Sequence, residues 1–384
     1  TLRDQIPAID GASVELTVDL DLQTYVQQAL EQAKANSGAE NASAVVLDAK
    51  TAEVLAMANT DTINPNEDTG KQIEQGKSFD NPSVTHPFEP GSVAKVITAA
   101  GVIQEGLTTP DEVLQVPGSI EMAGVSVGDA WDHGVVPYTT AGIFGKSSNV
   151  GTLMLAQRLG EDKFADYLER FGVGQSTGIE LPSESQGLLP AREQWSGGTF
   201  ANLPIGQGMS ITTLQMAGIY QALANDGERI EPRIIKSVTD SDGTVLEQPE
   251  PDKIQVVSAE AARTTVDMFR SVTQVDPTGV QQGTAPDASI EGYQISGKTG
   301  TAQKVDPNTG AYSNSQYWIT FAGIAPADDP RFVVAIMLDE PERGVHGGGG
   351  QTAAPLFKDI ATWLLNRDNI PLSAATEPII LQAQ

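Results

Sequence analysis

The segments that could build a core sheet lie near the two ends of this 384-residue chain. Residues 44–48 and 53–58 are apolar and joined by a short turn, which predicts a hairpin. Three further apolar or alternating segments occur much later, at 294–303, 317–325 and 332–338. Helical patterns and loops fill most of the chain between them. We therefore expect an α+β fold, in which an antiparallel five-stranded sheet is covered by helices and carries an inserted helical subdomain.

Apolar residues at helical spacing account for most of the remaining chain. The predicted helices span about 21–37, 92–105, 150–159, 164–171, 211–223, 258–272 and 353–365. Ser210 is expected to cap the helix that begins at 211, and Gly227 to end it. The turn Asp240-Ser241-Asp242-Gly243 lies between two strand-like segments and predicts a surface hairpin.

Four segments are interpreted as lacking regular structure. Residues 60–88 and 108–140 are rich in polar and turn-forming residues, and we expect loops there. Gly344–Gly350 is too rich in glycine to hold one conformation and could act as a lid. The Pro- and Ala-rich residues after Asn369 are expected to form a surface strap or to be disordered.

The charge and the residue counts exclude several functions. Lys and Arg total 23 against 50 for Asp and Glu, and the resulting net charge of −27 repels phosphate backbones, so nucleic acid is not an expected partner. No cysteine is present, and His86, His133 and His346 lack zinc-ligand spacing, so we expect neither metal nor cofactor. His86 and His133 are interpreted as structural loop residues, and His346 as a mobile surface residue.

Ser92 and Lys95 form an S-x-x-K pair at the start of a predicted helix. Pro90 and Gly91 stop the preceding structure, so Ser92 lies in the first turn. Residues three apart share a helix face, which brings the Lys95 amine within reach of the Ser92 hydroxyl. This is the arrangement of a serine nucleophile with a lysine base. Taken alone, the pair fits a capping serine followed by an unrelated lysine better.

Two further motifs favour the catalytic interpretation. Ser147-Ser148-Asn149 (S-x-N) precedes a helical pattern, and Lys298-Thr299-Gly300-Thr301 (K-T-G-T) lies in a strand-like segment. The three motifs occur in this order in penicillin-binding proteins and class A β-lactamases, which the chain resembles in this respect. If the other motifs were absent, Ser147 and Asn149 would be interpreted as loop caps, and Lys298 as a solvated strand lysine.

The first two motifs supply the groups that move protons. Lys95 can accept the serine proton only when it is neutral. Burial and a nearby positive charge both lower a lysine pKa, and Lys298 is the expected neighbour. Ser147 could relay a proton to a leaving amine, and Asn149 could bond both Lys95 and a substrate amide.

The K-T-G-T strand supplies groups that could bind substrate. Lys298 is expected as a cation beside an anionic substrate group, and Thr299 and Thr301 add hydroxyls for a carboxylate. Gly300 lacks a Cβ, so a substrate backbone could lie close against the strand. The backbone N–H groups of Thr301 and Ser92 are candidates for an oxyanion hole.

Longer strings extend the resemblance to about residues 14–365. They are similar to class B penicillin-binding proteins, most of all to the division-specific septal transpeptidases (FtsI-like) of actinobacteria. The strings are FEPGSVAKV, FGKSSNVGTLMLAQRLG, FGVGQSTGIELPSESQGLLP, FANLPIGQGMS, QALANDGERIEPRIIKSV and GKTGTAQ. The resemblance implies the transpeptidase fold of penicillin-binding proteins and serine β-lactamases. The implied site residues are catalytic Ser92, Lys95, Ser147 and Asn149 and substrate-binding Lys298, Thr299, Gly300 and Thr301.

The resemblance also implies a reaction. Ser92 would attack the carbonyl of the penultimate D-alanine of a peptidoglycan stem peptide and expel the terminal D-alanine. The amine of a neighbouring stem would then resolve the acyl-enzyme and form the cross-link, whereas a β-lactam would remain bound to Ser92. The family further implies action outside the cell membrane at the septum, with a SEDS-type glycan polymerase and divisome proteins as partners.

Domain boundaries follow from the same resemblance. Residues 1–13 are expected to be a linker from a missing N-terminal anchor helix and pedestal, and 14–368 the transpeptidase domain. Its helical subdomain is expected at roughly 92–290, and residues 369–384 form a C-terminal tail. One departure is the turn Ala49–Ala52, where such proteins often carry a glycine, and this leaves the hairpin geometry open.

Other functions fit the same scaffold. A non-catalytic sensor of β-lactams or muropeptides would be acylated once without turnover. A D,D-carboxypeptidase or a β-lactamase would release its acyl group to water. Residues 179–189 contain no E-x-x-x-N element of the kind that class A β-lactamases use for deacylation, which disfavours penicillin hydrolysis.

Overall fold

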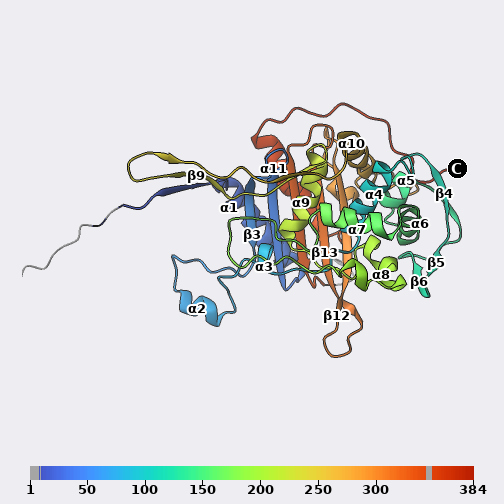
Figure 1. Cartoon of the computed structure of the whole chain (residues 1–384), viewed down its shortest axis with the longest axis horizontal. Helices are drawn as coiled ribbons and strands as arrows, with labels where there is room; N and C mark the ends of the chain where they lie inside the picture. Colours follow the sequence, from blue (N-terminus) through green and yellow to red (C-terminus); the bar gives the residue numbers. More distant parts are fainter. Residues whose placement is uncertain (1–7, 9, 343–347) are drawn as a thin grey trace, which may run out of the picture.

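A five-stranded antiparallel sheet lies at the centre of the molecule (Figure 1). This computed structural model describes residues 8, 10–342 and 348–384, so His346 and most of the predicted lid segment Gly344–Gly350 lie outside the described residues. In spatial order the strands are β12 (Ser296–Val305), β13 (Tyr312–Ala325), β14 (Phe332–Asp339), β2 (Asn41–Asp48) and β3 (Val54–Asn59). The two early strands thus join the three late ones, as predicted.

The register explains why the middle strands are continuous apolar runs. Val46 of β2 lies opposite Val334 of β14, and Ala335 of β14 lies opposite Ala322 of β13. The first seven residues of β14 are buried without interruption, because helices cover both faces of the sheet. Burial of each large aliphatic side chain contributes about 1.5–3 kcal/mol, so this strand anchors the core.

Helices pack on both faces of the sheet (Figure 1). On one face α1 (Leu20–Ser37) and α11 (Ala353–Arg367) contact each other, and α9 (Thr213–Ala224) packs on the other face. In α1 the Asp19 carboxylate accepts a bond from Leu22 N, and the helix ends at Gly38 with φ 68°. The prediction for this helix is confirmed.

A group of helices lies beside the β12 edge of the sheet (Figure 1). Its helices are α4 (Lys95–Gln104), α5 (Thr140–Gly145), α6 (Asn149–Leu159), α7 (Glu161–Arg170), α8 (Gly197–Asn202) and α10 (Ala259–Met268). Short 3₁₀ turns occur at η1 (Gly91–Ala94), η2 (Arg192–Gln194), η3 (Leu203–Ile205), η4 (Phe269–Val272) and η5 (Pro286–Ala288).

Residues 108–140, expected to be loops, contain two small antiparallel ribbons. They consist of β4 (Val113–Val116) with β7 (Val136–Thr139), and β5 (Ser119–Met122) with β6 (Val125–Gly128). Alternation over only four residues is too short to stand out in a polar sequence, which is why the prediction was wrong here. Residues 60–88 also depart from a pure loop, since they include α2 (Thr69–Glu74) and α3 (Pro82–Thr85).

The cap of α9 corrects a second prediction. The helix begins after Thr212, whose hydroxyl accepts from Gln215 N while the Gln215 side chain accepts from Thr212 N. This capping box satisfies two backbone donors at once, an advantage that Ser210 cannot offer. The backbone of Ser210 pairs instead with Leu188.

The β2–β3 turn forms although it lacks the expected glycine. Asp48 accepts bonds from the backbone N–H groups of Lys50 and Thr51, and Ala52 takes the left-handed conformation at φ 58°. The hairpin therefore forms, with a shift of register between Val46 and Leu47 and with an alanine where glycine is favoured.

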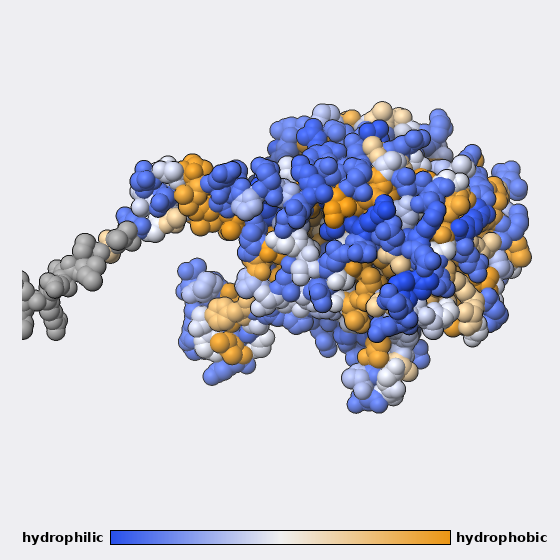
Figure 2. Space-filling model, viewed as in Figure 1, coloured by the Kyte–Doolittle hydropathy of each residue, from blue (hydrophilic) through white to orange (hydrophobic). Residues whose placement is uncertain are grey.

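Two peripheral features complete the fold. An arm of β1 (Ser13–Leu16), β9 (Ile235–Thr239) and β10 (Val245–Leu246) projects from the body and exposes apolar side chains such as Val14 and Val245 (Figures 1 and 2). A smaller ribbon pairs β8 (Glu228–Ile230) with β11 (Lys253–Gln255). The tail after Asn369 runs back to β7, where Thr139 N donates to Leu381 O. None of the helices in the described ranges has the length and apolarity needed to cross a bilayer.

Candidate active site

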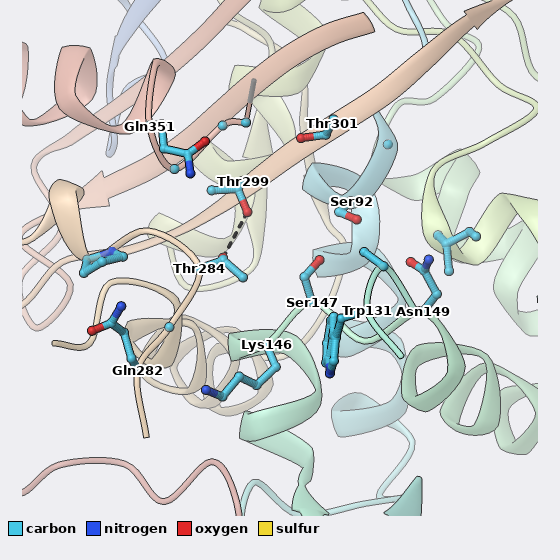
Figure 3. Close-up of a pocket in the computed structure, with 18 of the residues that line it drawn as sticks. Ser92, Trp131, Lys146, Ser147, Asn149, Gln282, Thr284, Thr299, Thr301 and Gln351 are labelled. Carbon is cyan, nitrogen blue, oxygen red and sulfur yellow. Dashed lines mark hydrogen bonds between the residues drawn. The ribbon is translucent and has the colours of Figure 1, made fainter. Parts of the chain in front are cut away.

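Three segments that are far apart in the sequence meet around one cavity of about 520 Å³. Ser92 comes from η1, Ser147 from the turn before α6, Asn149 from the first position of α6, and Thr299 and Thr301 from β12. Figure 3 shows these side chains around the same hollow from separate elements. The predicted site residues are therefore brought together, and five of them line the cavity.

The turn that carries Ser92 is pressed against β12. Gly91 has φ 59°, and a Cβ there would meet the Ala302 Cβ at 3.1 Å. A Cβ on Gly300 would lie 2.8 Å from Pro90 O and 2.1 Å from Thr320 Oγ1. Gly300 thus lets the Ser92 turn and β13 approach the strand, and the predicted room for a substrate backbone stays a prediction.

Lys95 is the first residue of α4 and is fully buried, with 0% of its surface exposed. Its Nζ donates to Asn149 Oδ1 at 2.7 Å, to Ser147 O at 2.9 Å and to Ser147 Oγ at 3.2 Å. These three acceptors match the three hydrogens of a protonated amine, so deprotonation frees a lone pair in the middle of the site.

Lys298 contacts the same Ser147 hydroxyl as Lys95. Its Nζ donates to Ser147 Oγ at 2.9 Å, to Thr299 O at 3.1 Å and to Thr299 Oγ1 at 3.4 Å, and the residue is 0% exposed. Lys298 thus lies behind the cavity lining, and a ligand in the cavity would meet Ser147 and Thr299 first. Two amines share one hydroxyl, which makes Ser147 Oγ the link between them.

Burial sets the proton affinity of both amines. It lowers the pKa of Lys95 to about 7, although the negative charge of Asp129 opposes the shift. Burial and then the charge of Lys95 lower the pKa of Lys298 well below its usual range. Two positive charges on one hydroxyl repel each other, so the pair gives up a proton readily near neutral pH. The predicted neutral lysine is therefore physically accessible.

The S-x-N turn holds a strained residue. Ser147 has φ 60°, a conformation that costs roughly 1–2 kcal/mol for a residue with a Cβ. It directs the Ser147 carbonyl and hydroxyl to the same amine. Ser148 Oγ caps α6 by accepting from Gly151 N, so capping and catalytic geometry come from adjacent residues.

Several cavity residues were not found from the sequence. Trp131, Lys146, Gln282, Thr284 and Gln351 line the hollow, and Thr284 Oγ1 bonds to Thr299 Oγ1 at 3.0 Å (Figure 3). Asp129 lies directly behind the S-x-N turn, where it bonds to Ser148 across a separation of 19 residues. Lys146 directly precedes the S-x-N motif in the sequence, whereas tertiary contacts alone bring in the other residues.

Comparison with known proteins identifies the family. Residues 42–362 match the model of the penicillin binding protein transpeptidase domain. The chain belongs to this family. Its predicted membership and transpeptidase fold are thereby confirmed, together with the five-stranded antiparallel sheet.

Relatives in the family extend over nearly the whole chain. It is 61% identical over 382 residues to penicillin-binding protein PbpB of Mycolicibacterium smegmatis, covering 99% of this chain and 59% of PbpB. It is 34% identical to the peptidoglycan D,D-transpeptidase FtsI of Escherichia coli, covering 95% of this chain and 58% of FtsI. The chain therefore spans about three-fifths of the length of these relatives.

A solved structure of a relative has closely the same fold as this chain. Penicillin binding protein 3 of Mycobacterium tuberculosis, complexed with ampicillin, is 59% identical and superposes with a TM-score of 0.96. The match covers 100% of this chain and 84% of that chain. The same protein is also known complexed with aztreonam, with a TM-score of 0.95.

Proposed function

We propose that this domain is a serine D,D-transpeptidase that cross-links peptidoglycan stem peptides through an acyl-enzyme on Ser92. The carrying observation is the shared contact of Lys95 and Lys298 with Ser147 Oγ, at 3.2 and 2.9 Å, in the cavity that Ser92 lines. The names and β-lactam complexes of the relatives support the same chemistry.

In the first step Ser92 Oγ bonds to the carbonyl carbon of the penultimate D-alanine. Its proton passes to the neutral Nζ of Lys95, and the carbonyl oxygen becomes an oxyanion. The backbone N–H groups of Ser92 and Thr301 are the proposed donors to that oxyanion. The low pKa of Lys95 makes this transfer possible near pH 7.

In the second step the bond between the carbonyl carbon and the leaving nitrogen breaks. Ser147 Oγ gives its hydrogen to the leaving amine and regains one from Lys95, so the terminal D-alanine departs neutralised at nitrogen. The hydroxyls of Thr299 and Thr301 are the proposed ligands of its carboxylate, with the charge of Lys298 behind them.

In the third step the acceptor amine attacks the ester carbonyl. It loses a proton to Lys95, the bond to Ser92 Oγ breaks, and that proton returns to the serine. A new amide joins the two stems and the site is restored. Asn149, which bonds Lys95 through Oδ1, is the proposed contact for a substrate amide.

Mass spectrometry of the intact protein after penicillin treatment tests this function. We expect a single penicilloyl adduct, located on the Ser92 peptide by mapping, and none on a Ser92→Ala variant. Steady release of the leaving group from a thioester substrate would exclude a sensor that is acylated only once, and rapid nitrocefin hydrolysis would favour a β-lactamase. An unlabelled wild-type protein would refute the proposal.

The proposal extends to the setting of the whole protein, on the strength of the family resemblance. Residues 14–368 are assigned to the catalytic domain, with the helical subdomain at about 92–290, after a linker of residues 1–13 and before a tail of residues 369–384. An N-terminal helix would anchor the domain on the outer face of the membrane at the septum. A SEDS-type polymerase would supply the glycan strands there, alongside other divisome proteins.

A further inference from the structure

The carboxylate of Asp129 accepts hydrogen bonds from residues of the S-x-N turn and of the start of α6. It follows β6 directly, and its side chain is 0% exposed. Oδ1 accepts from Val150 N at 3.0 Å, and Oδ2 accepts from Ser148 Oγ at 2.7 Å. The preceding residue adds a third link, since Gly128 O accepts from Asn149 Nδ2 at 3.1 Å. Residues 128–129 thus hold the turn on which Ser147 and Asn149 lie.

His133 lies in the same loop and contacts the carboxylate of Asp129. Its Nε2 lies 2.9 Å from Asp129 Oδ2, and its side chain is only 8% exposed. The ring stacks on Trp131, with centroids 5.3 Å apart, and meets the edge of Tyr138 at 6.4 Å. Because Trp131 lines the catalytic cavity, His133 connects the cavity wall to the carboxylate behind it.

Hydrogen-bond accounting fixes how many protons the pair holds. His133 Nδ1 lies 2.6 Å from Gly134 O, and a carbonyl oxygen only accepts, so Nδ1 carries a hydrogen. Ser148 Oγ already accepts from Gly151 N, so its own hydrogen points to Asp129. A second proton must therefore lie between His133 Nε2 and Asp129 Oδ2, and we place it on the ring because an imidazole is more basic than a carboxylate.

The pair is close enough to influence the catalytic amine. The charge of Asp129 favours the protonated form of Lys95, against the larger effect of burial. The charge of Asp129 acts on Lys95 of α4 and on Tyr138 of β7, and burial and that charge raise the pKa of Tyr138. Lys298 on β12 is influenced by the charge of Lys95 instead. A proton on His133 offsets the carboxylate charge and so weakens its pull on Lys95.

We propose that Asp129 and His133 are positioning residues for the acyl transfer. Together they hold the strained Ser147 turn against Lys95 and balance the charge that this amine experiences. This inference rests on the proposed function and deepens it. The sequence interpretation of His133 as a loop histidine is extended by it, since a nearly buried ring in contact with a buried carboxylate does more than cover a loop.

The pH profile of acylation by a fluorescent penicillin tests the proposal. In His133→Gln the carboxylate is no longer offset, so Lys95 holds its proton more tightly and the acid limb should move up by about one pH unit. In Asp129→Asn the attraction is lost, so the limb should move down, and the plateau should fall about tenfold because the turn loses an acceptor. Opposite displacements are the expected result, and displacements in one direction, or none, would overturn it.

His86 supplies the matched control. It is also a loop histidine beside an aspartate, with Nδ1 3.1 Å from Asp80, but its side chain is 64% exposed. His86→Gln should leave the acylation profile of the protein unchanged. A change as large as that of His133→Gln would show that loss of any loop histidine has the same effect, and would overturn the specific role.

A measurement on the unaltered protein removes the dependence on folding of the variants. Nitrogen-15 NMR of the histidine rings, assigned by comparison with His86→Gln and His346→Gln, should show both His133 nitrogens protonated at pH 7. A neutral ring would refute the proton accounting. Failure of the wild-type protein to react with penicillin would instead refute the proposed function, so the two failures are distinguishable.

Discussion

Lys298 and Lys304 lie six residues apart on β12, and their surroundings are opposite. Lys298 is fully buried, its bonds within the described part of the chain go to Ser147 and Thr299, and its pKa falls. Lys304 is 20% exposed and bonds to two carboxylates, with Asp339 Oδ1 at 2.8 Å. Burial would lower its pKa too, but the bonds to Asp339 and Glu340 outweigh that effect and raise it. One strand therefore carries a lysine with a fixed charge and a lysine with an adjustable one.

The difference between the two lysines lies in whether a carboxylate contacts the amine. A lysine becomes a permanent cation when a carboxylate contacts it, and a reactive amine when only neutral acceptors do. Lys95 follows Lys298 in this respect, because its direct partners are an amide and a serine. The nearest acidic influence, Asp129, acts from behind the S-x-N turn.

Removal of the amine at each kind of site should give the largest contrast. We expect Lys95→Met to lower the acylation rate constant about 10³-fold, since a positioned base contributes roughly 10²–10⁴. Lys304→Met should leave that rate within about twofold, because a structural ion pair has no part in proton transfer. Stopped-flow or gel measurements with a fluorescent penicillin would compare them, and acylation of Lys95→Met within tenfold of wild type would contradict the assignment.

A carboxylate in direct contact with the Lys95 amine should keep that amine protonated, as the carboxylates beside Lys304 do. Asn149 Oδ1 lies 2.7 Å from Nζ, so Asn149→Asp adds a negative charge in direct contact. An opposite charge at this distance raises a lysine pKa by about 1–3 units, so acylation at pH 7 should fall about 10–100-fold and recover near pH 9.

The wild-type profile is the reference for that shift. Its acylation rate should rise with pH through about 7, because Lys95 must lose its proton to act and regains it as the pH falls. Asn149→Ala removes the bond without adding charge, so it should lower the rate at every pH and leave the midpoint near that of wild type. An unmoved midpoint in Asn149→Asp would contradict the charge argument.

Loss of Lys304 should change the free energy of unfolding, whereas loss of Lys298 or Lys95 should change the rate of acylation. Lys304→Met leaves Asp339 and Glu340, which are 14% and 17% exposed, without their cation, and we expect a loss of about 2 kcal/mol in the free energy of unfolding. The exposed pair Lys236–Glu15 is the control, because Lys236→Met should cost less than about 1 kcal/mol. Denaturant titration of the three proteins measures both, and equal losses would contradict the comparison.

The smallest expected effect lies at the far edge of the sheet. Ala52→Gly relieves the left-handed alanine at φ 58°, and we expect a gain of about 0.5–1 kcal/mol in unfolding free energy. Acylation should not change, since stability at β3 is separate from charge at β12. Thermal unfolding and penicillin labelling of the same sample would test both statements.

Local patterns were enough to predict the sheet and the three motifs. The S-x-x-K spacing is a property of one helical turn, and the strands of the sheet are continuous or alternating apolar runs, so both can be recognised in the sequence. The capping of α9 was placed two residues early, because Ser210 and Thr212 are both good caps and only the partner Gln215 decides between them.

The remainder of the site depends on contacts that no spacing encodes. Asp129 reaches Ser148 only because the short ribbon of β5 and β6 folds beside α6, and those strands are too brief to predict. The close packing at Gly300 was likewise not predicted. Its sequence context shows a missing side chain, whereas the neighbours that fill the space, Pro90 and Thr320, belong to other elements.

The seam between the catalytic turn and β12 limits how this protein could change under selection by an inhibitor. Gly91 and Gly300 leave almost no free space there, since a Cβ on Gly91 would meet the Ala302 Cβ and a Cβ on Gly300 would meet Thr320 Oγ1 and Pro90 O. Adaptive substitutions would have to accumulate around the mouth of the cavity, at residues such as Trp131, Gln282 and Gln351. A compound that takes its contacts from the peptide groups of the seam would leave the fewest routes of escape.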